Sequence, residues 1–246
     1  MSADAFLFQE GVFMNIVKSI RGLSKLEKGI WISSLILIVS TFVLFKTEDY
    51  LTVLASLIGA TALIFVGKGD ALGQFLTIVF AVLYSIVSFQ CRYYGEMLTY
   101  LGMTLPSAAV AMVNWLKHPY AEREVKVNVL HRKQWFFLGI SAVIATAVFG
   151  VALEKLGTAN LLFSVISITT SYFASMLVIY RSPYYAVAYA LNDIVLIVLW
   201  VLVTREDINY LPMIICFVVF LANDIYGFCN WRLMKERQRE AATGRK

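Results

Sequence analysis

Residues 181–231 read RSPYYAVAYALNDIVLIVLWVLVTREDINYLPMIICFVVFLANDIYGFCNW. This stretch contains two apolar segments of helix length, joined by a short charged turn. Each segment holds one carboxylate in its interior, Asp193 in the first and Asp224 in the second, and the other apolar segments of the chain hold none. An ionisable group inside an apolar membrane helix is costly, so it faces protein or a water-filled cavity and marks a substrate or ion pathway. The alternative is that both acids only bond neighbouring helices.

Helical spacing places the polar and aromatic residues of each segment on one face. In the first segment, offsets of three and four residues join Tyr185, Tyr189, Asn192, Asp193, Leu196 and Trp200. In the second, they join Asn223, Tyr226, Gly227, Asn230 and Trp231, with Asp224 beside them. Aromatic rings can stack on a ring, and amide and carboxylate groups can hydrogen-bond to hydroxyls. The two faces therefore predict a pocket for a small, uncharged or cationic ligand that combines a ring and a sugar.

The composition is that of an integral membrane protein. The chain has 246 residues, of which 60% are hydrophobic and 15% charged, whereas about a quarter of the residues of a soluble domain are charged. The net charge of +5 does not indicate nucleic acid as a partner, because the basic residues lie between the apolar segments. Cys91, Cys216 and Cys229 show neither metal-ligand nor disulfide spacing. We expect no cofactor and no metal site.

Eight apolar segments are each close to the roughly 20 residues that span a bilayer as a helix. They are residues 29–45, 50–66, 71–90, 97–116, 135–153, 159–180, 184–204 and 210–231. Residues 1–28 lack the apolar stretch and cleavage site of a signal peptide. We interpret them as a weakly amphipathic lead on the cytoplasmic membrane surface. The predicted fold class is an all-α integral membrane protein with eight transmembrane helices.

The distribution of basic residues predicts the orientation in the membrane. With the N-terminus in the cytoplasm, the inside segments hold 17 of the 21 lysines and arginines, and the outside loops hold the other 4. This excess places both termini inside. A reporter fused after Lys246 and another inserted in the loop of residues 117–134 are both expected to read cytoplasmic. An external signal from either reporter would overturn the eight-helix topology.

An internal repeat relates residues 50–116 to residues 159–231. Each copy has a basic residue at its cytoplasmic turn, Lys68 or Arg181, and each ends in Asn-Trp, at residues 114–115 and 230–231. One linker helix, residues 135–153, lies between the copies, so two three-helix units have the same orientation. Transporters with such parallel repeats bind substrate near the membrane midplane between the repeats. The extra helix of residues 29–46, the loop of residues 117–134 and the basic tail of residues 232–246 lie outside the repeat.

In the first copy, the amide side chains of Gln74 and Gln90 are costly to bury, which favours a functional interpretation. Asn114 belongs to the Asn-Trp pair near the end of this copy. The hydroxyl groups of Thr77, Ser85 and Ser88 are typical of helix packing. The candidate substrate-binding residues are Gln74, Gln90, Asn114, Tyr185, Tyr189, Asn192, Asp193, Trp200, Asn223, Asp224 and Tyr226.

The sequence argues against an enzyme. Both histidines, His118 and His131, lie in the loop between apolar segments, so a membrane-embedded hydrolase or metalloenzyme would lack its base or its ligands. Phosphate-binding loops and nucleophile motifs are absent from the sequence. The acids Asp193 and Asp224 suggest an intramembrane aspartyl protease, but the flanking motifs of such an enzyme are missing.

The pattern of helices and motifs resembles the PnuC family of bacterial vitamin transporters, whose best-known members carry nicotinamide riboside. The resemblance covers residues 50–232. It rests on helices grouped as one, three, one and three, on the Arg181 turn, on Asn192 and on the closing Gly227-x-x-x-Trp231. It implies a SWEET-like fold, facilitated diffusion in the bacterial inner membrane, a homotrimer and a cytoplasmic kinase that phosphorylates the riboside and traps it.

Within this resemblance, the family's glutamine at the end of its second repeat helix corresponds to Gln90, and its asparagine after the basic turn to Asn192. Many members have tryptophans four and seven residues after the basic residue, where this chain has Tyr185 and Ala188. Stacking on Tyr185 and Tyr189 stays possible, but another vitamin or nucleoside, such as thiamine, riboflavin or a deoxyribonucleoside, is an alternative substrate. Two further alternatives are proton coupling through Asp193 or Asp224, and a non-transporting receptor or scaffold.

Overall fold

The computed structural model describes residues 16–45, 50–90, 93–121, 124–158, 160–205, 208 and 211–244. Within them the elements are helices: α2 (Ile16–Arg21), α3 (Lys25–Leu44), α4 (Tyr50–Lys68), α5 (Ala71–Gln90), α6 (Tyr94–Thr99), the π-helical turn η1 (Tyr100–Thr104), α7 (Leu105–Lys117), α8 (Arg132–Lys155), α9 (Leu161–Ile179), α10 (Tyr185–Thr204) and α11 (Leu211–Thr243). Counting α6, η1 and α7 as one, eight are long and apolar enough to cross a membrane. The predicted all-helical class is confirmed. Most of the lead (residues 1–15) and positions 46, 91, 92, 159, 210 and 246, which the sequence analysis used, lie outside the described residues.

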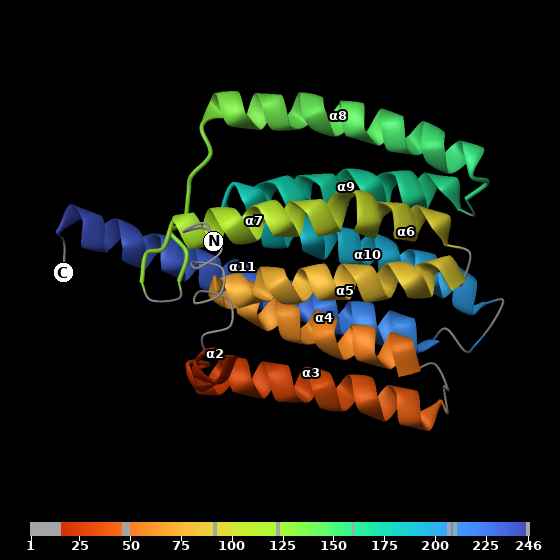
Figure 1. Cartoon of the computed structure of the whole chain (residues 1–246), viewed down its shortest axis with the longest axis horizontal. Coiled ribbons are helices and arrows are strands. Elements are labelled where there is room, and N and C mark those ends of the chain that lie inside the picture. The colour runs from red at the N-terminus through yellow and green to blue at the C-terminus, as the bar shows by residue number, and fades with distance from the viewer. Residues whose placement is uncertain are drawn as a thin grey trace, which may run out of the picture.

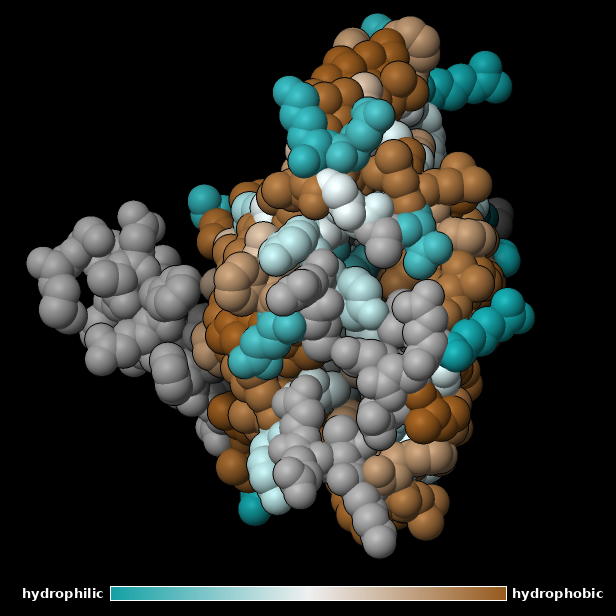
Figure 2. Space-filling model, turned by 90° about the vertical axis from the view of Figure 1, so that its right-hand side faces the viewer, coloured by the Kyte–Doolittle hydropathy of each residue, from teal (hydrophilic) through white to brown (hydrophobic). Residues whose placement is uncertain are grey.

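Helices α3 and α8 lie at opposite edges of the bundle, with the other spans between them (Figure 1). In the most apolar 18 residues of each span, 28% of residues are buried in α3 and 17% in α8. The corresponding share is 44–56% in the other six spans. An end view shows α8 projecting from a bundle whose flanks are mainly hydrophobic (Figure 2). The extra helix and the linker helix are thus peripheral, and six helices form the centre.

The ends of the helices follow from local capping rather than from hydropathy. Helix α3 begins four residues before the predicted position because Ser24 and Glu27 form a capping box. In it the Glu27 N–H donates to Ser24 Oγ (3.2 Å) and the Ser24 N–H donates to Glu27 Oε2 (2.6 Å). Glu27 Oε1 also accepts a hydrogen bond from the Tyr226 hydroxyl (2.9 Å). The cap therefore ties the start of α3 to α11.

The last helix continues to Thr243, into the segment that the sequence analysis treats as a basic tail. There the side chain of Gln238 is buried and holds the loop after α7. Its amide nitrogen donates to the Val125 carbonyl (3.0 Å) and to Glu124 Oε1 (2.9 Å), and its oxygen accepts from the Val127 N–H (2.8 Å). The adjacent Arg237 makes an exposed ion pair with Glu124 (3.0 Å).

We expect Gln238→Ala to release this loop and Arg237→Ala to leave it in place. Loss of Gln238 leaves buried backbone groups unpaired, at about 1 to 2 kcal/mol, whereas an exposed ion pair contributes about 1 kcal/mol or less. Limited trypsin digestion in detergent would measure the difference as cleavage of residues 117–131, roughly five- to thirtyfold faster in Gln238→Ala. Equal cleavage rates in the two variants would contradict this account.

Reciprocal hydrogen bonds connect the two three-helix units. At the end of α7, the Trp115 indole donates to the Val178 carbonyl (3.0 Å) and the neighbouring Asn114 amide donates to the Ile179 carbonyl (2.6 Å), both in α9. In α11, the Trp231 indole donates to Val66 (2.9 Å) and Asn230 to Gly67 (2.9 Å), both in α4. The rings of Trp115 and Trp231 lie 5.3 Å apart. This exchange of equivalent contacts supports the predicted repeat.

The turns between the first two helices of each unit also correspond. Gly69 and Arg181 both have positive φ (77° and 57°). Their N–H groups donate to the equivalent carbonyls of Val66 and Val178 (2.9 and 3.0 Å). The left-handed position of each turn is thus Gly69 in one unit and Arg181 in the other. The basic residue of the first turn, Lys68, lies one position earlier and donates to the Gly22 carbonyl.

The segments predicted to lie inside gather at one end of the bundle, where α2, the loop after α7 and the extension of α11 meet (Figure 1). Ser19 Oγ in α2 donates to Asp70 Oδ2 (2.8 Å) in the turn after α4. The loop reaches both turns, since the Val125 N–H donates to the Gly69 carbonyl (3.1 Å) and the Asn128 N–H to the Arg181 carbonyl (3.0 Å). The segments rich in lysine and arginine therefore lie at the same end of the bundle, which is consistent with the orientation predicted from the count of basic residues.

Candidate functional site

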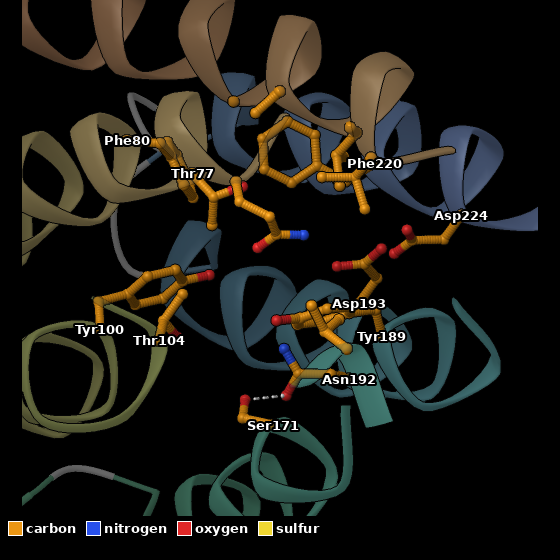
Figure 3. Close-up of a pocket in the computed structure, with 16 residues that line it drawn as sticks. Thr77, Phe80, Tyr100, Thr104, Ser171, Tyr189, Asn192, Asp193, Phe220 and Asp224 are labelled. Carbon is orange, nitrogen blue, oxygen red and sulfur yellow. Dashed lines mark hydrogen bonds between the residues drawn. The ribbon is translucent and has the colours of Figure 1, made fainter. Parts of the chain in front are cut away.

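A cavity lies between the two three-helix units (Figure 3). All its lining residues come from α4, α5, η1, α9, α10 and α11: Gly59, Ala62, Leu63, Val66, Gln74, Thr77, Phe80, Tyr100, Thr104, Ser171, Val178, Tyr189, Asn192, Asp193, Phe220 and Asp224. The space between the lining side chains is about 640 Å³, including the part that opens to solvent. The peripheral helices α3 and α8 contribute no lining residue.

Asn192 is held in one orientation by hydroxyl groups of α9. Its Oδ1 accepts hydrogen bonds from Ser167 (3.1 Å), Thr170 (2.9 Å) and Ser171 (3.0 Å). Because hydroxyl donors surround the oxygen, the amide nitrogen is directed the other way, and Figure 3 shows it turned toward the cavity. Nδ2 has no partner within the described part of the chain, so it is available to donate to a ligand.

The two interior acids, Asp193 and Asp224, both line the cavity and face each other. Asp193 comes from α10 and Asp224 from α11, and their carboxyl groups point toward one another in Figure 3. They are only 4% and 3% exposed, and Asp193 Oδ2 has no hydrogen-bond partner among the described residues. The described residues contain no group of three or more His, Cys, Asp and Glu that could hold a metal. The pair is therefore a carboxyl site facing the cavity and not part of a larger acidic cluster.

Three aromatic rings in the cavity lining, those of Phe80, Tyr100 and Phe220, pack on one another. The ring of Phe80 meets those of Tyr100 and Phe220 edge to face, each at 5.6 Å between centroids. Tyr100 begins the π-helical turn η1, in which the Leu105 N–H bonds to the Tyr100 carbonyl. Pro106 follows and has no N–H to continue the regular ladder. Such single π turns are frequent at functional sites, and this one carries both Tyr100 and Thr104 to the cavity.

Two glycines allow the first unit to close around the site. A Cβ on Gly73 would lie 2.4 Å from the backbone nitrogen of Val66, so α4 and α5 can approach only without a side chain there. A Cβ on Gly59 would lie 2.6 Å from the ring of Phe220. Gln74, next to the first contact, is buried and lines the cavity. The close approach of these helices therefore places an amide opposite Asn192 and the acid pair.

Comparison with known proteins gives the family. The model of a family described as nicotinamide mononucleotide transporter matches residues 49–233, the region that holds both three-helix units. The chain belongs to this transporter family. The resemblance to PnuC proteins is confirmed, since relatives of that name match most of the chain.

Two curated members of the family are named nicotinamide riboside transporter PnuC. The protein of Neisseria mucosa is 27% identical over 216 residues, which is 85% of this chain and 82% of that protein. The protein of Haemophilus influenzae is 24% identical over 212 residues, with 85% and 90% covered. A crystal structure described as that of the vitamin B3 transporter PnuC superposes with a TM-score of 0.77 at 28% identity, covering 88% of this chain and 94% of that one.

In this family member, the candidate residues fall into two groups. Gln74, Tyr189, Asn192, Asp193 and Asp224 line the cavity. The others do not: Gln90 ends α5 with an exposed side chain, Asn114 donates to Ile179, Tyr185 packs on Trp231 (5.0 Å), Trp200 packs on Tyr93 (5.1 Å), Asn223 donates to Ser34 Oγ (3.2 Å) and Tyr226 donates to Glu27. The predicted aromatic stripe thus divides, and only Tyr189 presents its ring to the cavity.

The contribution of the fourth span to the cavity was not predicted from the sequence. The predicted segment starts at residue 97, whereas the helix begins at Tyr94 and contains a further buried acid, Glu96. Glu96, Tyr100 and Thr104 are spaced by four residues, and this polar stripe was the signal that would have directed attention to η1. Phe80 and Phe220 gave no such signal, because an apolar ring in an apolar helix does not reveal which neighbour it faces.

Proposed function

We propose that this protein carries nicotinamide riboside across the membrane. The observation that supports the proposal most directly is the cavity between the two units, which combines a directed amide donor with aromatic rings. The Asn192 amide can donate to a ribose hydroxyl, and the ring of Tyr189 or Tyr100 offers a surface on which the base can stack. The two curated relatives are both named as nicotinamide riboside transporters, which agrees with this substrate.

The lining of the cavity favours the riboside over the mononucleotide that gives the family its description. Among the residues that the structure describes, it includes Asp193 and Asp224 but no lysine, arginine or histidine. A phosphate group would bring negative charge toward two acids without a base to compensate it. We therefore propose the unphosphorylated nucleoside as the substrate.

We propose transport by facilitated diffusion, with no chemical step performed by this chain. A cytoplasmic kinase that phosphorylates the riboside would then prevent its return, since the product does not suit the cavity. We place the protein in the bacterial cytoplasmic membrane with both termini inside, on the strength of the basic segments that meet at one end. Assembly as a homotrimer is part of the same proposal and follows from the resemblance to PnuC proteins.

Uptake of labelled nicotinamide riboside into proteoliposomes tests the proposal. We expect uptake down the riboside gradient that is independent of a pH gradient and is not inhibited by excess nicotinamide mononucleotide. Uptake driven by the pH gradient would instead favour coupling of protons through Asp193 or Asp224. Absence of uptake with any vitamin would favour a non-transporting receptor or scaffold.

A second candidate is the transport of another vitamin or nucleoside. The observation that favours it is the packing of Tyr185, which is buried against Trp231 and does not reach the cavity. With Ala188 three residues further on, Tyr189 is left as the stacking ring on this helix. Thiamine, riboflavin and a deoxyribonucleoside belong in the same uptake experiment, and preference for one of them would replace the riboside.

A further inference from the structure

The buried acid pair has no basic partner in the part of the chain that the structure describes. Asp193 Oδ2 is unpartnered, and the cavity lining contains no lysine, arginine or histidine. The side-chain ion pair between Arg237 and Glu124 is in the loop and the α11 extension at one end of the bundle. The negative charge of the pair therefore needs a balance that the described lining does not provide.

The surroundings of the pair suit a delocalised cation. The rings of Tyr189, Tyr100, Phe80 and Phe220 line the same cavity, and the faces of aromatic rings attract positive charge. The carboxyl groups of Asp193 and Asp224 point toward one another (Figure 3), and both residues line the cavity. The negative charge that these carboxyl groups can carry complements a ligand with a positive charge.

We propose that Asp193 and Asp224 form a counter-charge site for a ligand ring with a permanent positive charge, so that the cavity selects cationic over neutral ring compounds. The inference rests on the proposed function in one respect, which is that the ring of nicotinamide riboside is a pyridinium. A pyridinium cannot lose its charge by releasing a proton. Its passage through a low-dielectric region therefore requires a fixed group of opposite charge.

Paired ligands that differ in charge test this role. The 1,4-dihydro form of nicotinamide riboside keeps the ribose and the carboxamide but has a neutral ring. We expect the parent protein, in binding measured by calorimetry, to prefer the cationic form by at least about tenfold. Asp193→Asn and Asp224→Asn keep the size of the side chain and are each expected to weaken binding of the cation by about tenfold or more, with the neutral form changed by less than about threefold.

Glu124→Gln is the matched control, since it makes the same acid-to-amide change in the loop outside the cavity, and it should leave both affinities unchanged. Elution as a single species in detergent and an unchanged melting temperature would establish that each variant is folded. Equal losses of both ligands in the asparagine variants would overturn the inference, as would a parent protein that binds the two forms equally. The comparison of the two forms on the parent protein needs no variant, so it does not depend on whether a variant folds.

Binding of thiamine, which is a cation, and of riboflavin, which is neutral, distinguishes a failure of this inference from a failure of the proposed function. If the parent protein binds thiamine but neither form of the riboside, and the asparagine variants lose thiamine, the charge site stands and the riboside assignment fails. If the riboside binds without preference for the cation, the assignment stands and the charge site fails. If no cationic ring compound binds, both fail.

Discussion

Trp231→Ala is expected to lower the free energy of unfolding by roughly 3 to 5 kcal/mol, the range for Trp truncation in a packed core. Trp231 is fully buried at 0% exposure, and its ring lies 5.3 Å from that of Trp115 and 5.0 Å from that of Tyr185. Its indole nitrogen donates to the Val66 carbonyl (2.9 Å). The variant loses this bond and opens a cavity at the contact between the two units. Denaturant titration in detergent micelles measures the change.

Two other tryptophans provide the comparison. Trp115 makes the equivalent bond to Val178 in the other unit, so Trp115→Ala is expected to destabilise the protein by a similar amount. Trp135 is 38% exposed on the peripheral helix α8, and Trp135→Ala should cost much less. A loss for Trp231→Ala no larger than that for Trp135→Ala would mean that the reciprocal bonds do not hold the two units together.

Asn192→Leu is expected to weaken binding of nicotinamide riboside by roughly ten- to a hundredfold. The amide nitrogen of Asn192 faces the cavity while three hydroxyl groups of α9 fix its oxygen. Loss of a buried polar partner typically costs about 1 to 3 kcal/mol, and leucine keeps the branched shape of the side chain without the donor. Calorimetry on the purified protein measures the affinity, and the melting temperature reports whether the variant is folded.

Asn223→Leu is the matched control for this variant. Asn223 is a buried amide in the next helix, but it donates to Ser34 in α3 and to the Val219 carbonyl, outside the cavity. Its replacement should lower stability without a comparable loss of affinity. Asn128 is less suitable as a control, because its side chain donates to the Tyr180 carbonyl at the turn before α10. Unchanged riboside binding in Asn192→Leu would remove this face from the site.

The sequence alone was sufficient for the class of protein and for the number of membrane spans. Apolar runs of about 20 residues leave helix as the only state in which backbone groups are paired within a bilayer. It also singled out Asp193, Asp224 and Asn192, which line the cavity, since the burial of a polar group in such a run is costly wherever the helix lies. These properties depend on the segment and its solvent and not on its neighbours.

Which side chains face one another was decided by the tertiary structure. Tyr185 and Tyr189 share a stripe in the sequence, but Tyr185 packs on Trp231 of α11, whereas Tyr189 lines the cavity. Asn223 and Tyr226 lie on a face of α11 that meets α3, a contact for which hydropathy gives no signal. The π turn that carries Tyr100 inward likewise depends on a single proline and on local hydrogen bonds. Helical period fixes the direction of a side chain relative to its own helix, whereas the partner it meets depends on how the helices pack.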